Sequence, residues 1–154
     1  MNRVNGNIRN SIRLEQFTRV CNILNIVVIP PVTLTLTNAW TTGYFDTDGS
    51  ISARFNLKPQ ITINIVNKFR SNLEFLVTPF NGAIYETKSK YHSYRWVIQS
   101  RSDVMHMYNY FTIYSPISWK KRRIQMIEEF YINREITNSI GGDKWSDFKS
   151  RWNA

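Results

Sequence analysis

A change of hydrophobic period at Gly49 constrains this chain more than any other feature of its sequence. Residues 38–46, just before it, have the spacing of a helix. Residues 50–58 and 60–65, just after it, alternate polar and apolar side chains on either side of a short turn, which predicts a β-hairpin. Asp48 is therefore expected at a corner between a helix and a strand, with Gly49 as the left-handed residue that closes the helix.

The same periodicities predict the other elements of the chain. The expected ranges are a helix over 9–24 closed by Pro30-Pro31, a helix over 69–80, strands over 83–88 and 92–100, and helices over 102–110 and 118–135. The order is helix, two strands, helix, two strands and two helices, which is an α+β arrangement. A tail over 143–154 is expected to dock on this body through Trp145, Phe148 and Trp152.

Two carboxylates, Asp46 and Asp48, end the predicted helix before Gly49. A helix C-terminus already carries about half a negative charge, so each acid there costs about 0.3–1 kcal/mol unless a cation compensates it. One interpretation is a metal ion, and the other is a surface turn rich in Asp and Gly. An EF-hand loop is excluded, because its positions 1 and 12 would be Tyr44 and Phe55, which have no carboxylate.

The stretch Thr-Thr-Gly-Tyr-Phe-Asp-Thr-Asp-Gly at 41–49 resembles the LAGLIDADG motif of homing endonucleases and intron maturases. It keeps the glycine, the aromatic middle and the terminal acid-x-acid-Gly, while two threonines replace the usual Leu-Ala. The order of elements over 38–135 also follows that family. The resemblance implies a single αββαββαα domain with a four-stranded antiparallel saddle sheet. It further implies that this helix meets a second motif helix, for which we expect contacts from Thr42, Gly43 and Asp46.

The resemblance also divides the chain into three parts. The endonuclease-like domain is expected over 38–136, and a C-terminal tail over 137–154 is expected to pack on it. Residues 2–21 resemble the tail of a first repeat in two-motif intron-encoded endonucleases, so 1–37 is expected to be a remnant of an upstream repeat followed by a linker. An alternative remains for the first 14 residues, because their arginines without any acid imitate a mitochondrial targeting peptide.

The net charge favours one class of partner over the others. The chain has 20 Lys and Arg against 11 Asp and Glu, a net charge of +9 and a pI near 9.9, which favours polyanions. Nucleic acid is the leading partner, and an anionic membrane surface or a purely solubilising charge is the alternative. The longest apolar run, 26–29, is far shorter than the roughly 20 residues of a spanning helix, so no membrane insertion is expected. One cysteine and two separated histidines cannot assemble a zinc site.

The polar face of the first predicted hairpin carries no acid and is rich in side chains that hydrogen-bond to base edges. A two-stranded ribbon fits the major groove of duplex DNA, so we predict base reading there; a plain solvent face is the alternative. The second hairpin has a weaker form of the pattern. The predicted nucleic-acid-binding residues are Ser52, Arg54, Asn56, Lys58, Gln60, Thr62, Asn64, Lys68, Tyr85, Thr87, Lys88, Ser93 and Arg95, with Lys68 and Lys88 as phosphate contacts.

The resemblance assigns chemistry to few residues. It implies that Asp48 binds Mg²⁺ or another divalent cation, assisted by the carbonyl of Gly49, and that Asp46 is structural. Hydrolysis of a phosphodiester needs charge neutralisation and an activated water, which divalent ions supply. The basic run at 120–123 resembles the helix start where the family keeps an active-site lysine. Motif spacing favours Lys121 over Lys120 for that role, and a phosphate-binding helix end is the alternative.

The number of motifs separates two functional hypotheses. Family members cut two strands with two motifs, whereas this chain has one, so a second copy or a separate chain must supply the other. The first hypothesis is a Mg²⁺-dependent, intron-encoded DNA endonuclease, favoured by the intact Asp48. The second is a non-cleaving RNA-binding maturase or ribonucleoprotein component, favoured by the missing motif. The resemblance implies a mitochondrial location, with the plastid as the second choice.

Overall fold

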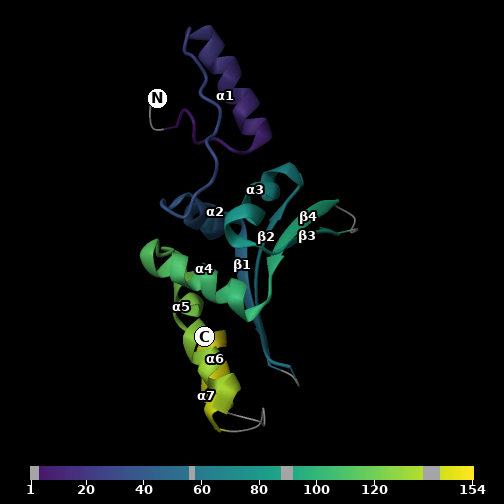
Figure 1. Ribbon diagram of the computed structural model, residues 1–154, viewed down its shortest axis with the longest axis vertical. Helices are drawn as coiled ribbons and strands as arrows, with labels where there is room; N and C mark the ends of the chain where they lie inside the picture. The colour runs from purple at the N-terminus through teal and green to yellow at the C-terminus, as the bar shows by residue number, and fades with distance from the viewer. Residues whose placement is uncertain (1–3, 56–57, 88–91, 137–142) are drawn as a thin grey trace.

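The computed structural model describes residues 4–55, 58–87, 92–136 and 143–154, and two of the predicted contacts, Asn56 and Lys88, lie outside these ranges. An N-terminal arm precedes a body built around one sheet (Figure 1). In chain order the elements are α1 (Ser11–Ile23), α2 (Trp40–Asp48), β1 (Gly49–Arg54), β2 (Gln60–Asn67), α3 (Ser71–Phe80), β3 (Ala83–Thr87), β4 (Ser93–Ile98), α4 (Arg101–Ile113), α5 (Lys120–Gln125), α6 (Ile127–Ile136) and α7 (Asp143–Asn153).

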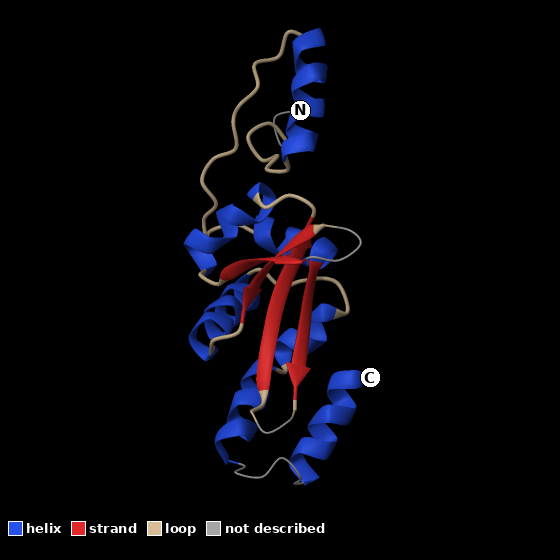
Figure 2. Cartoon of the chain, turned by 90° about the vertical axis from the view of Figure 1, so that its right-hand side faces the viewer, coloured by secondary structure: helices blue, strands red, loops and turns tan. Residues whose placement is uncertain are grey.

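The four strands form one antiparallel sheet in the order β1-β2-β4-β3 (Figure 2), so the predicted sheet is confirmed. The register places Ile51 opposite Ile63, and Ile63 opposite Ile98. Because side chains in neighbouring strands share a face at paired positions, these three isoleucines form a continuous apolar row across the sheet. All three are buried. One face of the sheet is thus committed to the core.

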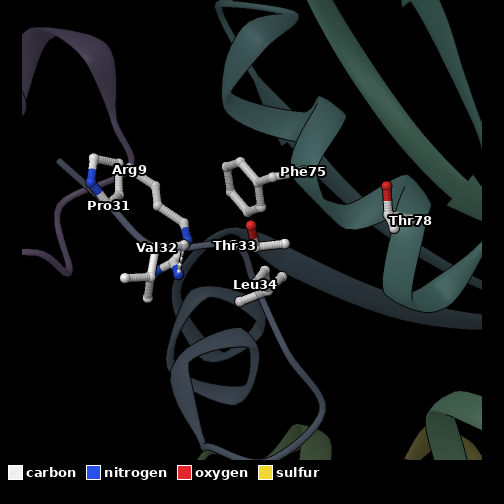
Figure 3. Close-up of a pocket in the computed structure, with 7 residues that line it drawn as sticks. All are labelled: Arg9, Pro31, Val32, Thr33, Leu34, Phe75 and Thr78. Carbon is white, nitrogen blue, oxygen red and sulfur yellow. Dashed lines mark hydrogen bonds between the residues drawn. The ribbon is translucent and has the colours of Figure 1, made fainter.

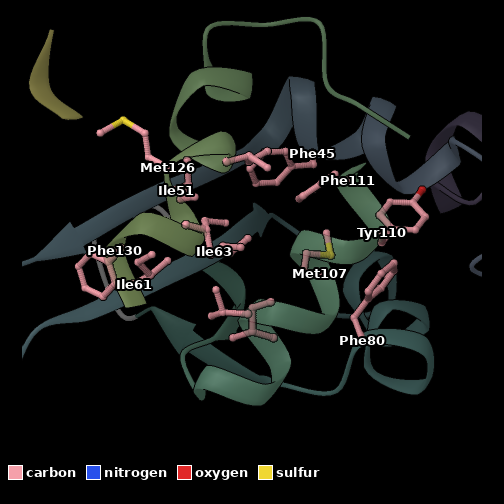
Figure 4. Close-up of a cluster of buried hydrophobic side chains, with 14 of the residues drawn as sticks. Phe45, Ile51, Ile61, Ile63, Phe80, Met107, Tyr110, Phe111, Met126 and Phe130 are labelled. Carbon is pink, nitrogen blue, oxygen red and sulfur yellow. The ribbon is translucent and has the colours of Figure 1, made fainter. Parts of the chain in front are cut away.

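Helices cover this apolar face and leave the other face open. Figure 4 shows Phe45 from α2, and Met107 and Phe111 from α4, packed against isoleucines of β1 and β2. The ring centroids of Phe45 and Phe111 lie 4.9 Å apart. The alternation of polar and apolar residues that predicted the hairpins therefore arises because only one face of the sheet packs on the core.

The arm extends away from the body and is joined to it by few contacts (Figure 1). The guanidinium of Arg9 lies 4.7 Å from the ring centroid of Trp40, and the backbone N–H of Ser11 donates to Oδ1 of Asn72 at 3.2 Å. Figure 3 shows Arg9 and the 31–34 segment facing Phe75 and Thr78 of α3 across a pocket. Among the described residues, no helix has the length and apolar character needed to cross a membrane.

Two details of the prediction are corrected. The helix expected over 118–135 is interrupted at Met126, where α5 ends and α6 begins. Gly49 is not left-handed: its φ of −83° and ψ of 158° are extended, because the chain passes directly from α2 into β1. The position has no room for a side chain, since a Cβ would lie 2.2 Å from Cδ2 of Phe45 and 2.6 Å from its carbonyl oxygen.

Gly43, within α2, and Gly49, at its end, give a matched test of the packing at position 49. Gly49→Ala is expected to lower the free energy of unfolding by about 1–3 kcal/mol, because the new methyl overlaps Phe45 in the core. Gly43→Ala has no atom within 4 Å of its new Cβ and is expected to raise it by up to about 1 kcal/mol, through helix propensity. Urea unfolding of both variants measures the difference, and equal effects at the two positions would contradict it.

Candidate functional site

The C-terminal end of α2 is held by a buried lysine. Nζ of Lys120 donates to the carbonyl oxygens of Phe45 at 2.8 Å and Asp46 at 2.7 Å. The side chain is only 5% exposed. Burial lowers the pKa of this ammonium, while the charges of Asp46 and Asp48 act in the opposite direction. The last carbonyls of a helix lack intrahelical partners and carry negative partial charge, so a cation there stabilises the helix end.

Asp46 is occupied by the loop that leads into α5. Its carboxylate accepts from the backbone N–H of Ile117 at 2.9 Å and from the hydroxyl of Ser118 at 2.5 Å. Burial alone would raise the pKa of this carboxyl, but the hydrogen bonds from Ser118 and Ile117 outweigh it, so the pKa is lower than usual. Asp46 therefore joins α2 to α5, which is a structural role.

Asp48 is the acid at this corner that remains available. It is exposed and forms no hydrogen bond or ion pair within the described part of the chain. It borders a cavity that Tyr44 and Asn72 also line. Burial, together with the charge of Asp48, raises the pKa of the Tyr44 phenol to about 12. An acid at a helix C-terminus that forms no ion pair is an unfavourable arrangement, which a cation bound directly to its carboxylate would relieve.

The structure places Lys120, rather than Lys121, beside the two aspartates. Lys121 is exposed and lines a separate surface hollow with Tyr108 and Phe111 of α4. The sequence did contain a signal for this difference. Lys120 is spaced four and seven residues from Ile124 and Ile127, which are both buried, so the three share the inward face of the helical segment.

The outer face of the sheet gathers the predicted polar side chains of both hairpins. The register pairs Ser52 with Thr62 on the first hairpin, and Thr87 with Ser93 on the second. Hydrogen bonds across this face join Nη2 of Arg54 to Oε1 of Gln60 at 3.1 Å, and Nε2 of Gln99 to Oγ1 of Thr62 at 3.1 Å. A shallow hollow on this face is lined by Thr62, Tyr85, Thr87, Arg95, Val97 and Gln99.

Not every predicted contact lies at the centre of this face. Asn64 belongs to it, paired with Val97 of β4, but is only 9% exposed. Lys58 lies in the segment before β2, and Lys68 follows the end of β2; both are exposed. Among the described residues of the four strands, the outward positions carry arginines and no acid, since Glu86 alternates to the other side.

Comparison with known proteins agrees with this geometry. No protein-family model matches the sequence. The intron-encoded RNA maturase bI4 of Saccharomyces cerevisiae is 36% identical over 99% of this chain, and a probable intron-encoded endonuclease, aI2, of Debaryomyces hansenii is 30% identical over 99%. The intron-encoded DNA endonuclease ai2b of Dictyostelium discoideum is 27% identical over 97%. The chain spans about a quarter of the two yeast proteins, at 26% and 27%, and 62% of the third.

Solved structures share the architecture. The I-SmaMI LAGLIDADG homing endonuclease bound to cleaved DNA matches 90% of this chain with a TM-score of 0.62 and 13% identity. The homing endonuclease I-TnaI matches 73% with a TM-score of 0.62 and 15% identity. The fold is that of the LAGLIDADG endonucleases. Its sequence relatives are intron-encoded maturases and endonucleases.

The two solved structures differ in the share of their own chain that aligns with this protein. The match occupies 51% of the I-SmaMI chain and 83% of the I-TnaI chain. The LAGLIDADG fold therefore occurs both as half of a longer chain and as most of a shorter one. This chain has the size of one such unit.

The motif helix α2 has one exposed stripe. Thr42, expected at a partner helix, is instead 6% exposed, and its hydroxyl donates to the carbonyl of Tyr114 at 2.7 Å. Asp46 is engaged by the 117–118 loop, as described above. Of the three expected contacts, Gly43 alone lies on the exposed stripe, with Ala39 and Thr47 one turn on either side.

The donor set at the LAGLIDADG corner fits a divalent ion only in part. Among the described residues, no three His, Cys, Asp or Glu side chains gather in one place. Mg²⁺ does not need such a cage, because it keeps several waters and is commonly held by one or two carboxylates together with substrate phosphates. The exposed carboxylate of Asp48 and the carbonyl of Gly49 fit that mode.

The Asp46 contact gives a pH-dependent prediction. Because the pKa of Asp46 is lowered in the folded protein, its contribution to stability is present above the ordinary carboxyl pKa of 3.8 and is lost as pH falls through the lowered value. Asp46→Asn should therefore lower the free energy of unfolding by about 1–2 kcal/mol at pH 7, and by less at pH 3. Urea unfolding at both pH values measures this. Glu74→Gln, in an exposed pair with Arg70, is the control, and a pH-independent loss at position 46 would contradict the assignment.

Proposed function

We propose that this chain is one half of an intron-encoded LAGLIDADG endonuclease, which binds duplex DNA on the outer face of its sheet and hydrolyses a phosphodiester at the C-terminal end of α2. The observation that carries the proposal is Asp48. It is the carboxylate of this corner that no described side chain or N–H group occupies, while the Asp46 carboxylate and the carbonyls of Phe45 and Asp46 are engaged. LAGLIDADG endonucleases generally use divalent metals, which suits an available carboxylate.

The residues at the end of α2 have different proposed roles. Asp48 and the Gly49 carbonyl would hold Mg²⁺, which when bound neutralises charge on the scissile phosphate and lowers the pKa of a bound water. Lys120 uses two of its three N–H donors on α2 carbonyls, so it fixes the end of the helix and keeps one donor for a phosphate oxygen or water. We therefore assign the active-site lysine to Lys120 in place of Lys121.

The sheet supplies binding and sequence preference. Its outer face is polar, and it carries Arg54, bonded to Gln60; arginine is the side chain that most often reads a guanine edge in the major groove. Arg95 and Tyr85 occupy opposite positions on β4 and β3, so the second hairpin continues the same surface. The net charge of +9 favours the duplex as a whole, and salt is expected to weaken that part of the binding.

A partner with the same fold would complete the site. Two strands need two carboxylates at the centre, and the exposed stripe of Ala39, Gly43 and Thr47 is small enough to let a second motif helix approach closely. The Thr47 hydroxyl is bonded to carbonyls of its own helix, so it brings no unsatisfied donor to such a contact. A second copy of this chain would form an isologous pair and prefer pseudo-palindromic DNA. A separate chain with the other motif is the alternative.

RNA binding without cleavage is the second candidate function. It is favoured by the identity of 36% to a protein named as an RNA maturase, against 30% and 27% to two named as endonucleases. Tyr85, which is 60% exposed on the outer face, offers a ring on which an unpaired base can stack. Intron-encoded relatives from yeasts support an origin in an organelle intron, and we propose the mitochondrion as the location.

Cleavage of a duplex selected from a randomised library tests the catalytic assignments. Asp48→Asn is expected to abolish cleavage, at least about 1000-fold, with DNA affinity within about threefold, because it removes a metal ligand and leaves the sheet unchanged. Lys120→Met should also abolish cleavage, whereas the neighbouring Lys121→Met should retain it. If Asp48→Asn lowered DNA binding as much as cleavage, the role of Asp48 as a metal ligand would be refuted. If Lys121→Met abolished cleavage and Lys120→Met retained it, Lys121 would be the active-site lysine.

Molar mass in solution tests the partner. Light scattering with a duplex and Mg²⁺ is expected to give about twice 18.2 kDa of protein per complex. Gly43→Gln, which places a long side chain on the exposed stripe, should shift the complex to one copy, while Thr112→Gln, at an exposed position of α4, should not. A single copy per duplex for the unmodified protein would exclude the second copy and leave a separate chain as the partner.

A further inference from the structure

The outer end of the first hairpin lacks a third strand. β4 pairs with β2 only from Ile63 onward, while β1 continues to pair with β2 as far as Arg54 and Gln60. The last three pairs of this hairpin, over 52–54 and 60–62, therefore form a two-stranded ribbon that projects beyond the rest of the sheet (Figure 2). Isolated two-stranded ribbons are marginally stable in water, so other contacts must hold this one.

Aromatic side chains of the C-terminal helix cover the inner side of the ribbon. The ring of Phe55, directly after β1, has its centroid 5.7 Å from Trp145, 6.0 Å from Phe148 and 6.4 Å from Trp152. Those three residues all belong to α7 and are buried. α6 contributes Phe130, at 6.1 Å from Phe55. The ribbon is thus supported by α7 and α6, in place of a neighbouring strand.

The end of α7 is fastened to the helix that begins with Lys120. Nε of Arg123 donates to the carbonyl of Trp152 at 3.2 Å, and its Nη1 donates to the carbonyl of Ile51 in β1 at 3.1 Å. The guanidinium also lies 4.9 Å from the ring centroid of Trp119 and 5.5 Å from that of Trp152. One side chain of α5 therefore joins α7 and β1.

We propose that α7 is a positioning element that holds the outer end of the ribbon at a fixed place relative to Asp48 and Lys120, and so determines how far from the cleavage point the protein reads sequence. The inference rests on the function proposed above. Arg54 and Gln60, which are bonded to each other, lie at this outer end and face away from α7. Without α7 they would keep their chemistry but lose a fixed position, and discrimination at the outermost bases needs that position.

Two fully buried phenylalanines provide a matched pair of variants. Phe148→Leu removes a ring from the α7 contact, whereas Phe80→Leu removes one from the core between α3 and α4, away from the ribbon. Hydrogen exchange of the free protein is the first measurement. With Phe148→Leu, amides of 52–54 and 60–62 are expected to exchange about tenfold faster, with those of the β2–β4 pairing unchanged. Equal acceleration throughout the sheet, or none in the ribbon, would overturn the proposal.

Selection from a randomised duplex library is the second measurement. Compared with the unmodified protein, Phe148→Leu should lose about tenfold of base preference at the outermost selected positions and keep it at the central ones, since one good base contact is worth about that much. Phe80→Leu should affect all positions alike. Arg123→Gln, which leaves the contacts between Phe55 and the rings of α7 in place but removes the guanidinium bonds to Trp152 and Ile51, should give the same outer loss. Unchanged outer preference in both variants would refute the positioning role.

The two measurements separate this inference from the function on which it rests. If the unmodified protein selects no duplex but the ribbon amides respond to Phe148→Leu, then DNA reading fails while the support of the ribbon by α7 stands. If duplex selection succeeds and the outer positions do not respond to Phe148→Leu or Arg123→Gln, then the endonuclease proposal stands and the role of α7 in reading is wrong.

Discussion

The ammonium of Lys120 bound to the last carbonyls of α2 is the interaction on which the arrangement of the site depends. It compensates the negative end of the helix, so α2 can end in two carboxylates and turn at once into β1. It also connects α5 to the corner, and the bond from Ser118 to Asp46 strengthens the same connection. With the carbonyls and Asp46 satisfied in this way, Asp48 is left facing solvent at the point where the sheet begins.

The sheet and the corner are physically coupled. A side chain at position 49 would overlap Phe45, so only glycine fits there. Because the chain passes from α2 straight into β1 at this glycine, the start of the sheet lies next to Asp48. The inner isoleucines fix which side chains point outward, because a shift of one residue would bury Arg54 and expose Ile51. The hydrophobic core therefore determines the composition of the outer face of the sheet as well as the stability of the domain.

The fold of this chain occurs as a unit in chains of different length. The stripe of Ala39, Gly43 and Thr47 is exposed in the chain alone, and the match to about half of I-SmaMI and most of I-TnaI shows that nature uses the fold both within one chain and as a unit of its own. The arm before α2 carries exposed apolar side chains, such as Ile23 and Val27, and only Cys21 of α1 is buried. The arm contacts the body through Arg9 on the Trp40 ring, the carbonyl of Asn7, which accepts from Nε1 of Trp40, and the N–H of Ser11, which donates to Asn72.

The sequence by itself determined the strand alternation, the order of elements and the identity of the acid-rich corner, because these depend on local periodicity and on a short motif. It did not determine which lysine reaches that corner. Lys120 and Lys121 are chemically identical neighbours, and only the packing of α5, with Ile124 and Ile127 in the core, turns Lys120 inward. The sequence predicted that the tail docks through its aromatic residues, but the tertiary structure decided that it docks under the first hairpin. The tertiary structure also decided the break at Met126 and the extended backbone of Gly49, since each results from contacts that the local sequence pattern does not specify.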